Sequence, residues 1–132
     1  MEITVTQEQG RVPVTVLHVQ GDVNASTADQ FLEEAQQAYD DGARDMLIDL
    51  SKVSLLSSAG LRALHTIFNM LRSDSPEEND EAVRKGLTDG TFKSPHLKLL
   101  SPDKNVTQVL SMAGFDMFLE IHNNLKKAVA SF

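Results

Sequence analysis

The feature that most constrains the fold is the alternation of strand-like and helix-like segments along the 132 residues. Met46–Leu50 is a short, nearly continuous apolar run that stands between two segments with helical periodicity. Such a run is typical of a parallel strand covered on both faces. Because parallel strands need crossover connections, the alternation predicts an α/β domain with right-handed crossovers.

The remaining segments extend this pattern toward both ends. Alternating and β-branched residues predict two strands within the first 20 residues, separated by a turn at Gly10. The predicted order is β-β-α-β-α-β-α-β-α: a small, mainly parallel sheet of four to five strands with about four helices and room for an antiparallel strand at one edge. The later elements are expected at Ala28–Tyr39 (helix), Met46–Leu50 (strand), Leu61–Leu71 (helix), Leu97–Leu100 (strand), Val106–Ala113 (helix), Phe118–Ile121 (strand) and Leu125–Phe132 (helix).

The length of the chain fits a single domain over residues 1–132. Residues 73–95 interrupt the alternation of strands and helices. They carry six acidic but only three basic side chains, and the segment is longer than an ordinary connection between elements. We expect an acidic insertion there. A mobile, solvated loop is favoured over a docked element, although Ser75-Pro76-Glu77-Glu78 has the pattern of a helix capping box.

Charge and composition narrow the possible partners. The formal net charge is −7 and the pI is near 4.9, so a nucleic acid backbone would be repelled. No stretch approaches the roughly 18 apolar residues of a membrane helix, and the first residues do not resemble a secretion signal. We therefore expect a cytoplasmic protein without nucleic acid binding or direct membrane insertion.

The sequence predicts neither a metal nor a cofactor. It contains no cysteine, which removes disulfides and thiolate ligands. It also has no glycine-rich phosphate-binding motif. The histidines are scattered without the spacing of a chelating pair, at His18, His65, His96 and His122.

Two loops follow predicted strands and precede predicted helices, at residues 21–26 and 51–58, where functional groups gather in sheets of this kind. Ser57 and Ser58 stand directly before a helix, and capping is the common role of serine at such a place. Asp49 and His65 suggest a serine hydrolase arrangement. We reject it because His65 lies two turns inside the helix and is expected to point outward. No enzyme activity is predicted.

Three separated motifs carry a resemblance to a known family. The chain has Asp49-Leu50-Ser51, a short apolar loop, and then a serine pair that opens a helix. It resembles the STAS domain, and within that family the bacterial anti-sigma-factor antagonists. The motifs are Ser57-Ser58-Ala59-Gly60-Leu61, the loop Gly21-Asp22-Val23-Asn24, and the segment Val109 to Phe115. Together with the element order, the resemblance covers all but about residues 73–95.

The resemblance implies a phosphorylation switch. The second serine, Ser58, would be phosphorylated by a serine kinase that often doubles as the anti-sigma factor. The unphosphorylated form would bind that partner, and a PP2C-type phosphatase would reset the switch. Ser57 stands where sigma-regulating members commonly have aspartate, so Ser57 is the alternative phosphoacceptor. The predicted partner-binding residues are Asp22, Asn24, Leu55, Leu56, Ser57, Ala59, Gly60 and Arg62.

The alternative function implied by the family is a STAS interaction subunit that needs no phosphorylation, in a sensory scaffold or a membrane transporter complex. The position of the serines favours a switch on physical grounds. A helix N-terminus tolerates a phosphate, which adds roughly −1.5 to −2 charge, because its backbone N–H groups and dipole are favourable to anions. A partner packed there would have to desolvate the dianion. The partner's identity and the oligomeric state stay open.

Overall fold

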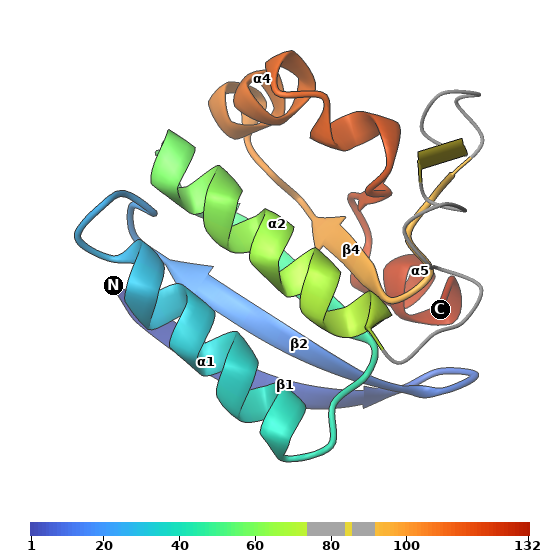
Figure 1. The fold of residues 1–132 in the computed structure, drawn as a ribbon. Helices are drawn as coiled ribbons and strands as arrows, with labels where there is room; N and C mark the ends of the chain where they lie inside the picture. Colours follow the sequence, from blue (N-terminus) through green and yellow to red (C-terminus); the bar gives the residue numbers. More distant parts are fainter. Residues whose placement is uncertain (74–83, 86–91) are drawn as a thin grey trace.

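The computed structural model describes residues 1–73, 84–85 and 92–132. It forms a five-stranded sheet in the order β1-β2-β3-β4-β5, with helices in the connections (Figure 1). The predicted α/β class and element order are confirmed. The elements are β1 (Glu2–Gln9), β2 (Pro13–Gln20), α1 (Ala28–Asp40), β3 (Met46–Lys52), α2 (Ser58–Arg72), β4 (Leu97–Leu100), α4 (Lys104–Met112), a 3-10 turn (Phe115–Met117), β5 (Ile121–His122) and α5 (Leu125–Ala130).

The sheet is parallel except at one edge. β1 pairs antiparallel with β2 in a hairpin that matches Glu2 with Gln20, whereas β2-β3, β3-β4 and β4-β5 are parallel. The antiparallel edge strand is therefore β1. The parallel strands end on the side of the molecule from which α2 starts, so both loops singled out in the sequence lie at the same edge of the sheet.

The two faces of the sheet are covered differently. α1 and α2 lie side by side across one face (Figure 1). They bury Phe31, Leu64 and Ile67 against the sheet residues Ile48 and Leu99, all with no exposed surface. The opposite face has a smaller apolar cluster beneath α5, formed by Val14, Val16, Leu47, Leu100, Ala128 and Val129. The larger core thus lies between the sheet and the helix pair.

The last predicted strand is displaced along the chain. We expected it at Phe118–Ile121, but β5 covers Ile121–His122 and a 3-10 turn precedes it. Phe118 and Leu119 are buried from irregular backbone instead, where the Phe118 ring lies 5.0 Å from the ring of Phe68. Phe118 and Leu119 therefore fill the core without joining the sheet, which the chain enters only at Ile121.

The predicted acidic insertion at 73–95 lies largely outside the described residues. Its end is described from Phe92 onward, where Ser94 is buried and its backbone N–H donates to the carbonyl oxygen of Phe118 at 2.8 Å. This bond fixes the chain directly before β4.

Candidate functional site at the start of helix α2

The two loops predicted to form the site are joined by backbone hydrogen bonds. The N–H of Val23 donates to the carbonyl oxygen of Leu55 at 2.9 Å, and the N–H of Ser57 donates to the carbonyl oxygen of Val23 at 2.9 Å. Val23 and Leu56 thereby form an isolated parallel bridge. The loop before α1 and the loop before α2 act as one structural unit, as the sequence predicted.

The two serines at the helix start have different surroundings. Ser57 is the N-cap of α2: it has extended backbone angles, and its Oγ accepts a long 3.4 Å hydrogen bond from the N–H of Gly60. Ser58 is the first residue of the helix, and its side chain is exposed. Because the cap is provided by Ser57, the Ser58 hydroxyl is not needed for helix initiation.

Gly60 is required by internal packing. A Cβ atom at this position would lie 2.6 Å from Cδ1 of Leu56, 2.9 Å from Cγ1 of Val23 and 3.1 Å from the carbonyl oxygen of Val23. Leu56 itself is only 2% exposed. We predicted both Leu56 and Gly60 as partner-binding residues, and their burial corrects this: neither offers surface to a partner. Their role is to seat the first turn of α2 on the neighbouring loop.

Asp22 and Asn24 shape the adjoining loop. Oδ1 of Asp22 accepts a 2.9 Å hydrogen bond from the hydroxyl of Ser54, which links the two loops by side chains. Oδ1 of Asn24 accepts from the N–H of Ser26 at 2.9 Å, and the carbonyl oxygen of Asn24 accepts from the N–H of Ala28 at 2.8 Å. Asn24 is therefore engaged in turn geometry, whereas the exposed Asp22 lies at the surface beside the serine loop.

The surface around Ser58 combines apolar and charged side chains. Leu55 is 48% exposed, which is unusual for a leucine next to a helix cap. Arg62 is exposed and lies one helical turn after Ser58, hence on the same side of α2. A shallow groove of about 220 Å³ runs between α1 and α2 beside this surface, lined by Ala25, Ala28, Asp29, Leu32, Ala59, Arg62, Ala63 and Thr66.

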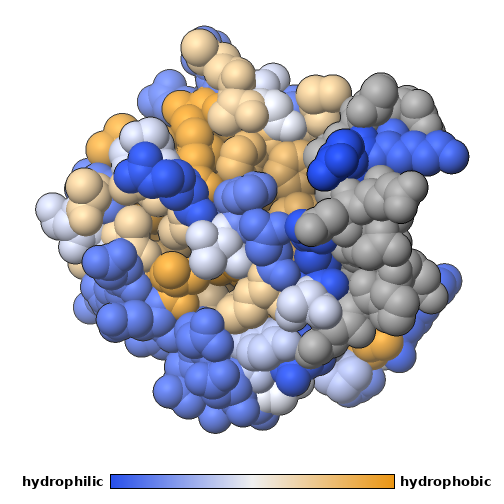
Figure 2. Space-filling model, in the orientation of Figure 1, coloured by the Kyte–Doolittle hydropathy of each residue, from blue (hydrophilic) through white to orange (hydrophobic). Residues whose placement is uncertain are grey.

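The surrounding surface on this side of the molecule is mixed, and the outward side of α1 is hydrophilic (Figure 2). This hydrophilic surface agrees with the acidic and amide side chains that α1 exposes, such as Glu33, Gln37 and Asp40. The exposed apolar side chain closest in sequence to Ser58 is Leu55. An apolar contact next to a modifiable hydroxyl is therefore available at the start of α2.

Asp49 does not complete a hydrolase triad with the serines. Its Oδ2 lies 2.7 Å from Nδ1 of His18, on the sheet face opposite α1 and α2. His65 is exposed on α2 and contacts Phe68 and Asn69 instead. The sequence analysis rejected a triad of Asp49 with His65; the structure pairs Asp49 with His18, because β2 lies beside β3, which the spacing of residues does not reveal.

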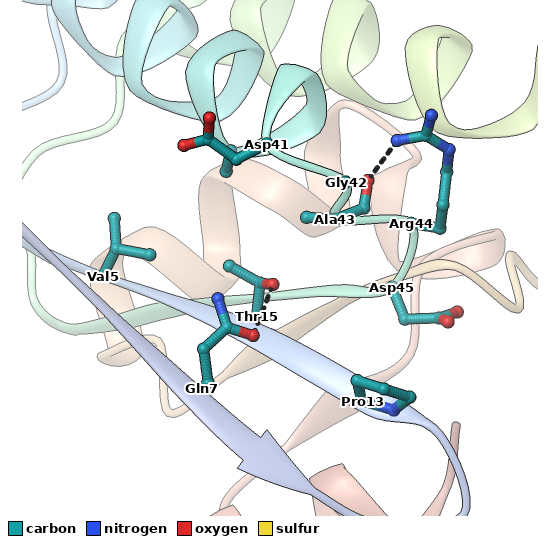
Figure 3. Close-up of a pocket in the computed structure, with 10 residues that line it drawn as sticks. Val5, Gln7, Pro13, Thr15, Asp41, Gly42, Ala43, Arg44 and Asp45 are labelled. Atoms are coloured by element: carbon teal, nitrogen blue, oxygen red, sulfur yellow. Dashed lines mark hydrogen bonds between the residues drawn. The ribbon is translucent and has the colours of Figure 1, made fainter.

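A larger hollow of about 340 Å³ lies at the opposite end of the sheet and contains none of the predicted site residues (Figure 3). Two hydrogen bonds join residues that line it: the Thr15 hydroxyl donates to Oε1 of Gln7 at 3.1 Å, and the Arg44 guanidinium donates to the carbonyl oxygen of Ala43 at 2.8 Å. These bonds connect β1 to β2 and close the turn after α1. The hollow is thus accounted for by structural contacts.

Within the residues that the structure describes, no group of three or more histidine, aspartate or glutamate side chains is arranged to hold a metal ion. In the same part of the chain, no helix combines the length and hydrophobicity needed to cross a membrane.

Comparison with known proteins identifies the family. The model of the STAS domain matches residues 4–75, which is more than half of the chain. A candidate anti-sigma factor antagonist of Bordetella bronchiseptica, BtrV, is 26% identical over 132 residues, covering 100% of this chain and 95% of BtrV. The chain belongs to the STAS domain family, and it resembles anti-sigma factor antagonists.

Solved structures share the fold. An anti-sigma factor antagonist from Mycobacterium paratuberculosis superposes with a TM-score of 0.70 at 20% identity, over 98% of this chain and 93% of that one. The antagonist SpoIIAA in its unphosphorylated form gives a TM-score of 0.66 at 14% identity, over 96% and 93%. SpoIIAA of Bacillus in its phosphorylated form gives 0.58 at 16% identity, over 96% of both chains. At these identities the likeness establishes the fold.

Proposed function

We propose that this STAS domain is a cytoplasmic protein-interaction switch of the anti-sigma-factor-antagonist type, controlled by phosphorylation of Ser58. The observation that carries the proposal is that the two serines at the start of α2 have different roles. Ser57 caps the helix, which leaves the Ser58 hydroxyl exposed and free of a structural task. The domain binds partners and catalyses no reaction at this site.

The partner of the unphosphorylated form is a serine kinase that also acts as an anti-sigma factor. It modifies Ser58 and is thereby released, and a PP2C-type phosphatase restores the binding form. The resemblance to anti-sigma factor antagonists supports this cycle. Further support comes from SpoIIAA, which has been solved in both an unphosphorylated and a phosphorylated form with the same overall fold as this chain.

The helix start provides the physical basis for a modification that leaves the fold intact. α2 is 15 residues long and begins at Ser58, so a phosphate on Ser58 lies in the first turn, where backbone N–H groups without helical partners and the helix dipole favour an anion. Arg62 lies four residues further on and adds a cation on the same side of the helix. A phosphate at Ser58 is therefore stabilised locally rather than repelled.

Binding, in contrast, is sensitive to the phosphate. A partner that covers Leu55, Ala59 and Arg62 must remove water from the Ser58 side chain, which costs little for a hydroxyl and much for a dianion. Arg62 is also drawn toward the phosphate and away from an acidic partner group. The same modification thus keeps the structure and weakens the contact.

The proposal is tested with Ser58→Ala and Ser58→Asp proteins, immobilised and exposed to an extract of the source organism. Captured proteins are identified by mass spectrometry, and the phosphate is mapped on protein isolated from cells. We expect Ser58→Ala to retain an anti-sigma factor or kinase that Ser58→Asp fails to capture. Equal capture by both variants, with no phosphate at Ser57 or Ser58 in cells, contradicts the switch.

The second candidate function is a STAS interaction subunit of a sensory scaffold or a transporter complex. It is favoured by one observation, namely serine at position 57 where sigma-regulating members commonly carry aspartate. This function predicts co-purification with a megadalton assembly or a membrane ATPase, unchanged by Ser58→Asp. The capture experiment therefore separates the two candidates.

A further inference from the structure

Three side chains from three neighbouring strands form a continuous chain of hydrogen bonds on the sheet face opposite α1 and α2. Oγ1 of Thr6 on β1 lies 2.9 Å from Nε2 of His18 on β2, and Nδ1 of His18 lies 2.7 Å from Oδ2 of Asp49 on β3. His18 and Asp49 are direct partners in the parallel pairing. Thr6 lies diagonal to His18, since the direct partner of His18 is Thr4.

The hydrogen bonds determine which ring nitrogen carries the proton. Burial alone would raise the pKa of Asp49, but the backbone N–H of Ser51 and the hydrogen bond from His18 together hold that pKa below its usual value. Asp49 is thus a carboxylate that can only accept, so Nδ1 of His18 must donate. In the neutral ring, Nε2 is then unprotonated and accepts the hydrogen bond from the Thr6 hydroxyl.

This arrangement has the form of an activated nucleophile. A hydroxyl within 2.6–3.2 Å of a base, with the base oriented by a third group, is the recurring geometry of covalent catalysis. His18 retains 33% of its side-chain exposure, and the Asp49 side chain retains 16%. The base is therefore reachable from solvent, while the carboxylate that orients it is largely shielded.

The three groups border a hollow of about 380 Å³ that also includes Lys52. Lys52 is exposed and brings a positive charge to the lining of this hollow, and a cation there favours a reaction that builds negative charge on a carbonyl oxygen. The charged residues that line this hollow together with His18 are Glu2 of β1 and Asp49 and Lys52 of β3, and Asp49 is hydrogen-bonded to His18. A small ester fits the volume, and a folded protein segment does not.

We propose that Thr6, His18 and Asp49 form a second site, which accepts acyl groups from small activated esters. Oγ1 of Thr6 attacks the ester carbonyl carbon as its proton passes to Nε2 of His18. The bond from the carbonyl carbon to the alkoxy oxygen breaks, and the leaving alcohol takes the proton from His18. Water then attacks the carbonyl carbon of the acyl-threonine as its proton passes to Nε2 of His18. The bond from that carbon to Oγ1 of Thr6 breaks, His18 returns the proton to Oγ1, and a carboxylic acid is released. The net reaction is ester plus water to acid plus alcohol.

This site is independent of the proposed switch. It lies on the other sheet face, and within the described part of the chain its residues make no hydrogen bond with Ser57 or Ser58. Ser58→Ala is consequently expected to leave acyl transfer unchanged, so failure of one proposal does not touch the other. The alternative explanation is that the hydrogen bonds among these three residues are purely structural and hold β1 against the sheet.

The test uses the full chain and p-nitrophenyl acetate, with release of p-nitrophenolate followed by absorbance and the acetylated residue located by mass spectrometry. We expect acetylation at Thr6, its loss in Thr6→Ala, and its retention in Thr6→Ser. His18→Gln is expected to slow acylation about 100-fold, the contribution typical of a general base.

Matched controls are available on the opposite side of the sheet. His65→Ala and Thr107→Ala alter exposed residues of the same types and are expected to leave the rate within about twofold of wild type, as for surface changes away from a site. If Thr6 is not acetylated, or if wild type and His18→Gln are acetylated at equal rates, the proposal is overturned and the contacts serve only to fasten the strands. Folding of each variant is checked by circular dichroism, and Thr6→Ser tests the nucleophile with minimal structural change.

Discussion

The two faces of the sheet are stabilised in different ways. The face beneath α1 and α2 is almost wholly apolar, and its buried side chains form one continuous cluster. The opposite face has a small apolar cluster under α5, flanked by charged and polar contacts such as His18 with Asp49 and Lys98 with Glu120. The first face depends on buried area, which is not directional, whereas the second depends on particular pairs of atoms.

The largest expected difference between the faces is in stability. Phe31→Ala on α1 removes a fully buried ring and is expected to cost about 3–5 kcal/mol of unfolding free energy. Val129→Ala on α5 removes two carbons from a side chain that is 7% exposed and is expected to cost about 1.5–2 kcal/mol. Urea denaturation of both variants measures the difference. Equal losses would contradict the unequal roles of the two faces.

Replacing Lys98 is expected to give the second largest loss of stability. It is 3% exposed, and its Nζ donates to the carbonyl oxygen of Ser131 at 2.8 Å, to Oγ of Ser131 at 3.0 Å and to Oε2 of Glu120 at 3.1 Å. Lys98→Ala is expected to cost about 2–3 kcal/mol, because it leaves these groups unpaired and opens a cavity.

Two variants sharpen the Lys98 measurement. Lys98→Met refills the volume without the hydrogen bonds and is expected to recover about 1 kcal/mol of that loss. The exposed Lys126 on α5 is the matched control, and its change to alanine is expected to stay within about 0.5 kcal/mol of wild type. If Lys98→Ala is as mild as Lys126→Ala, the polar contacts do not hold α5 in place.

Gly60 tests how tightly the start of α2 is packed beside Ser58. In Gly60→Ala the new methyl group would overlap Leu56 and Val23, and we expect a net loss of about 1–2 kcal/mol despite the better helix propensity of alanine. Leu56→Ala removes one of the side chains that the new methyl group would overlap. Gly60→Ala should therefore cost less unfolding free energy in the double variant, as measured by a double-mutant cycle. A strictly additive cycle would contradict the contact.

The smallest expected effect is a pH dependence of the polar face. Burial raises the pKa of Asp49 and of Glu120, but hydrogen bonds from Ser51 and His18 to Asp49, and from Lys98 to Glu120, outweigh it and lower both. A carboxyl with a lowered folded pKa contributes stability above its unfolded pKa, near 4, and loses it as pH falls through the folded value. Asp49→Asn should flatten the decline of stability below about pH 4, followed by urea denaturation. An unchanged decline would show that Asp49 does not contribute.

The sequence predicted the helix face more completely than the polar face, for a physical reason. Apolar periodicity in α1 and α2 and the run Met46–Leu50 report burial directly, so the α/β order followed from them. The pairs Thr6 with His18 and Lys98 with Ser131 depend on strand register and on a helix docked 33 residues later. Register is a tertiary property that local pattern does not reveal.

The same difference between local features and tertiary contacts applies to the candidate site. The sequence placed the two loops together and predicted helix capping as the common role for the serine pair, because strand ends and caps are local features, and the structure assigns the cap to Ser57. It misassigned Leu56 and Gly60 to the surface, since a loop residue that inserts into the core has the same sequence signature as an exposed one. The one available hint was Gly60, whose cost in a helix indicates a close contact.

The most direct test of the switch compares unmodified protein with protein that carries phosphoserine only at position 58, introduced during translation. Thermal unfolding and affinity for the captured kinase or anti-sigma factor are measured on the same two samples. We predict a melting temperature that is unchanged within about 2 °C, because the helix N-terminus and Arg62 accommodate the phosphate. We also predict that affinity falls at least about tenfold, the equivalent of 1.4 kcal/mol. Equal affinity of the two forms, or a loss of affinity that comes with unfolding of α2, would contradict a switch that changes binding while preserving the fold.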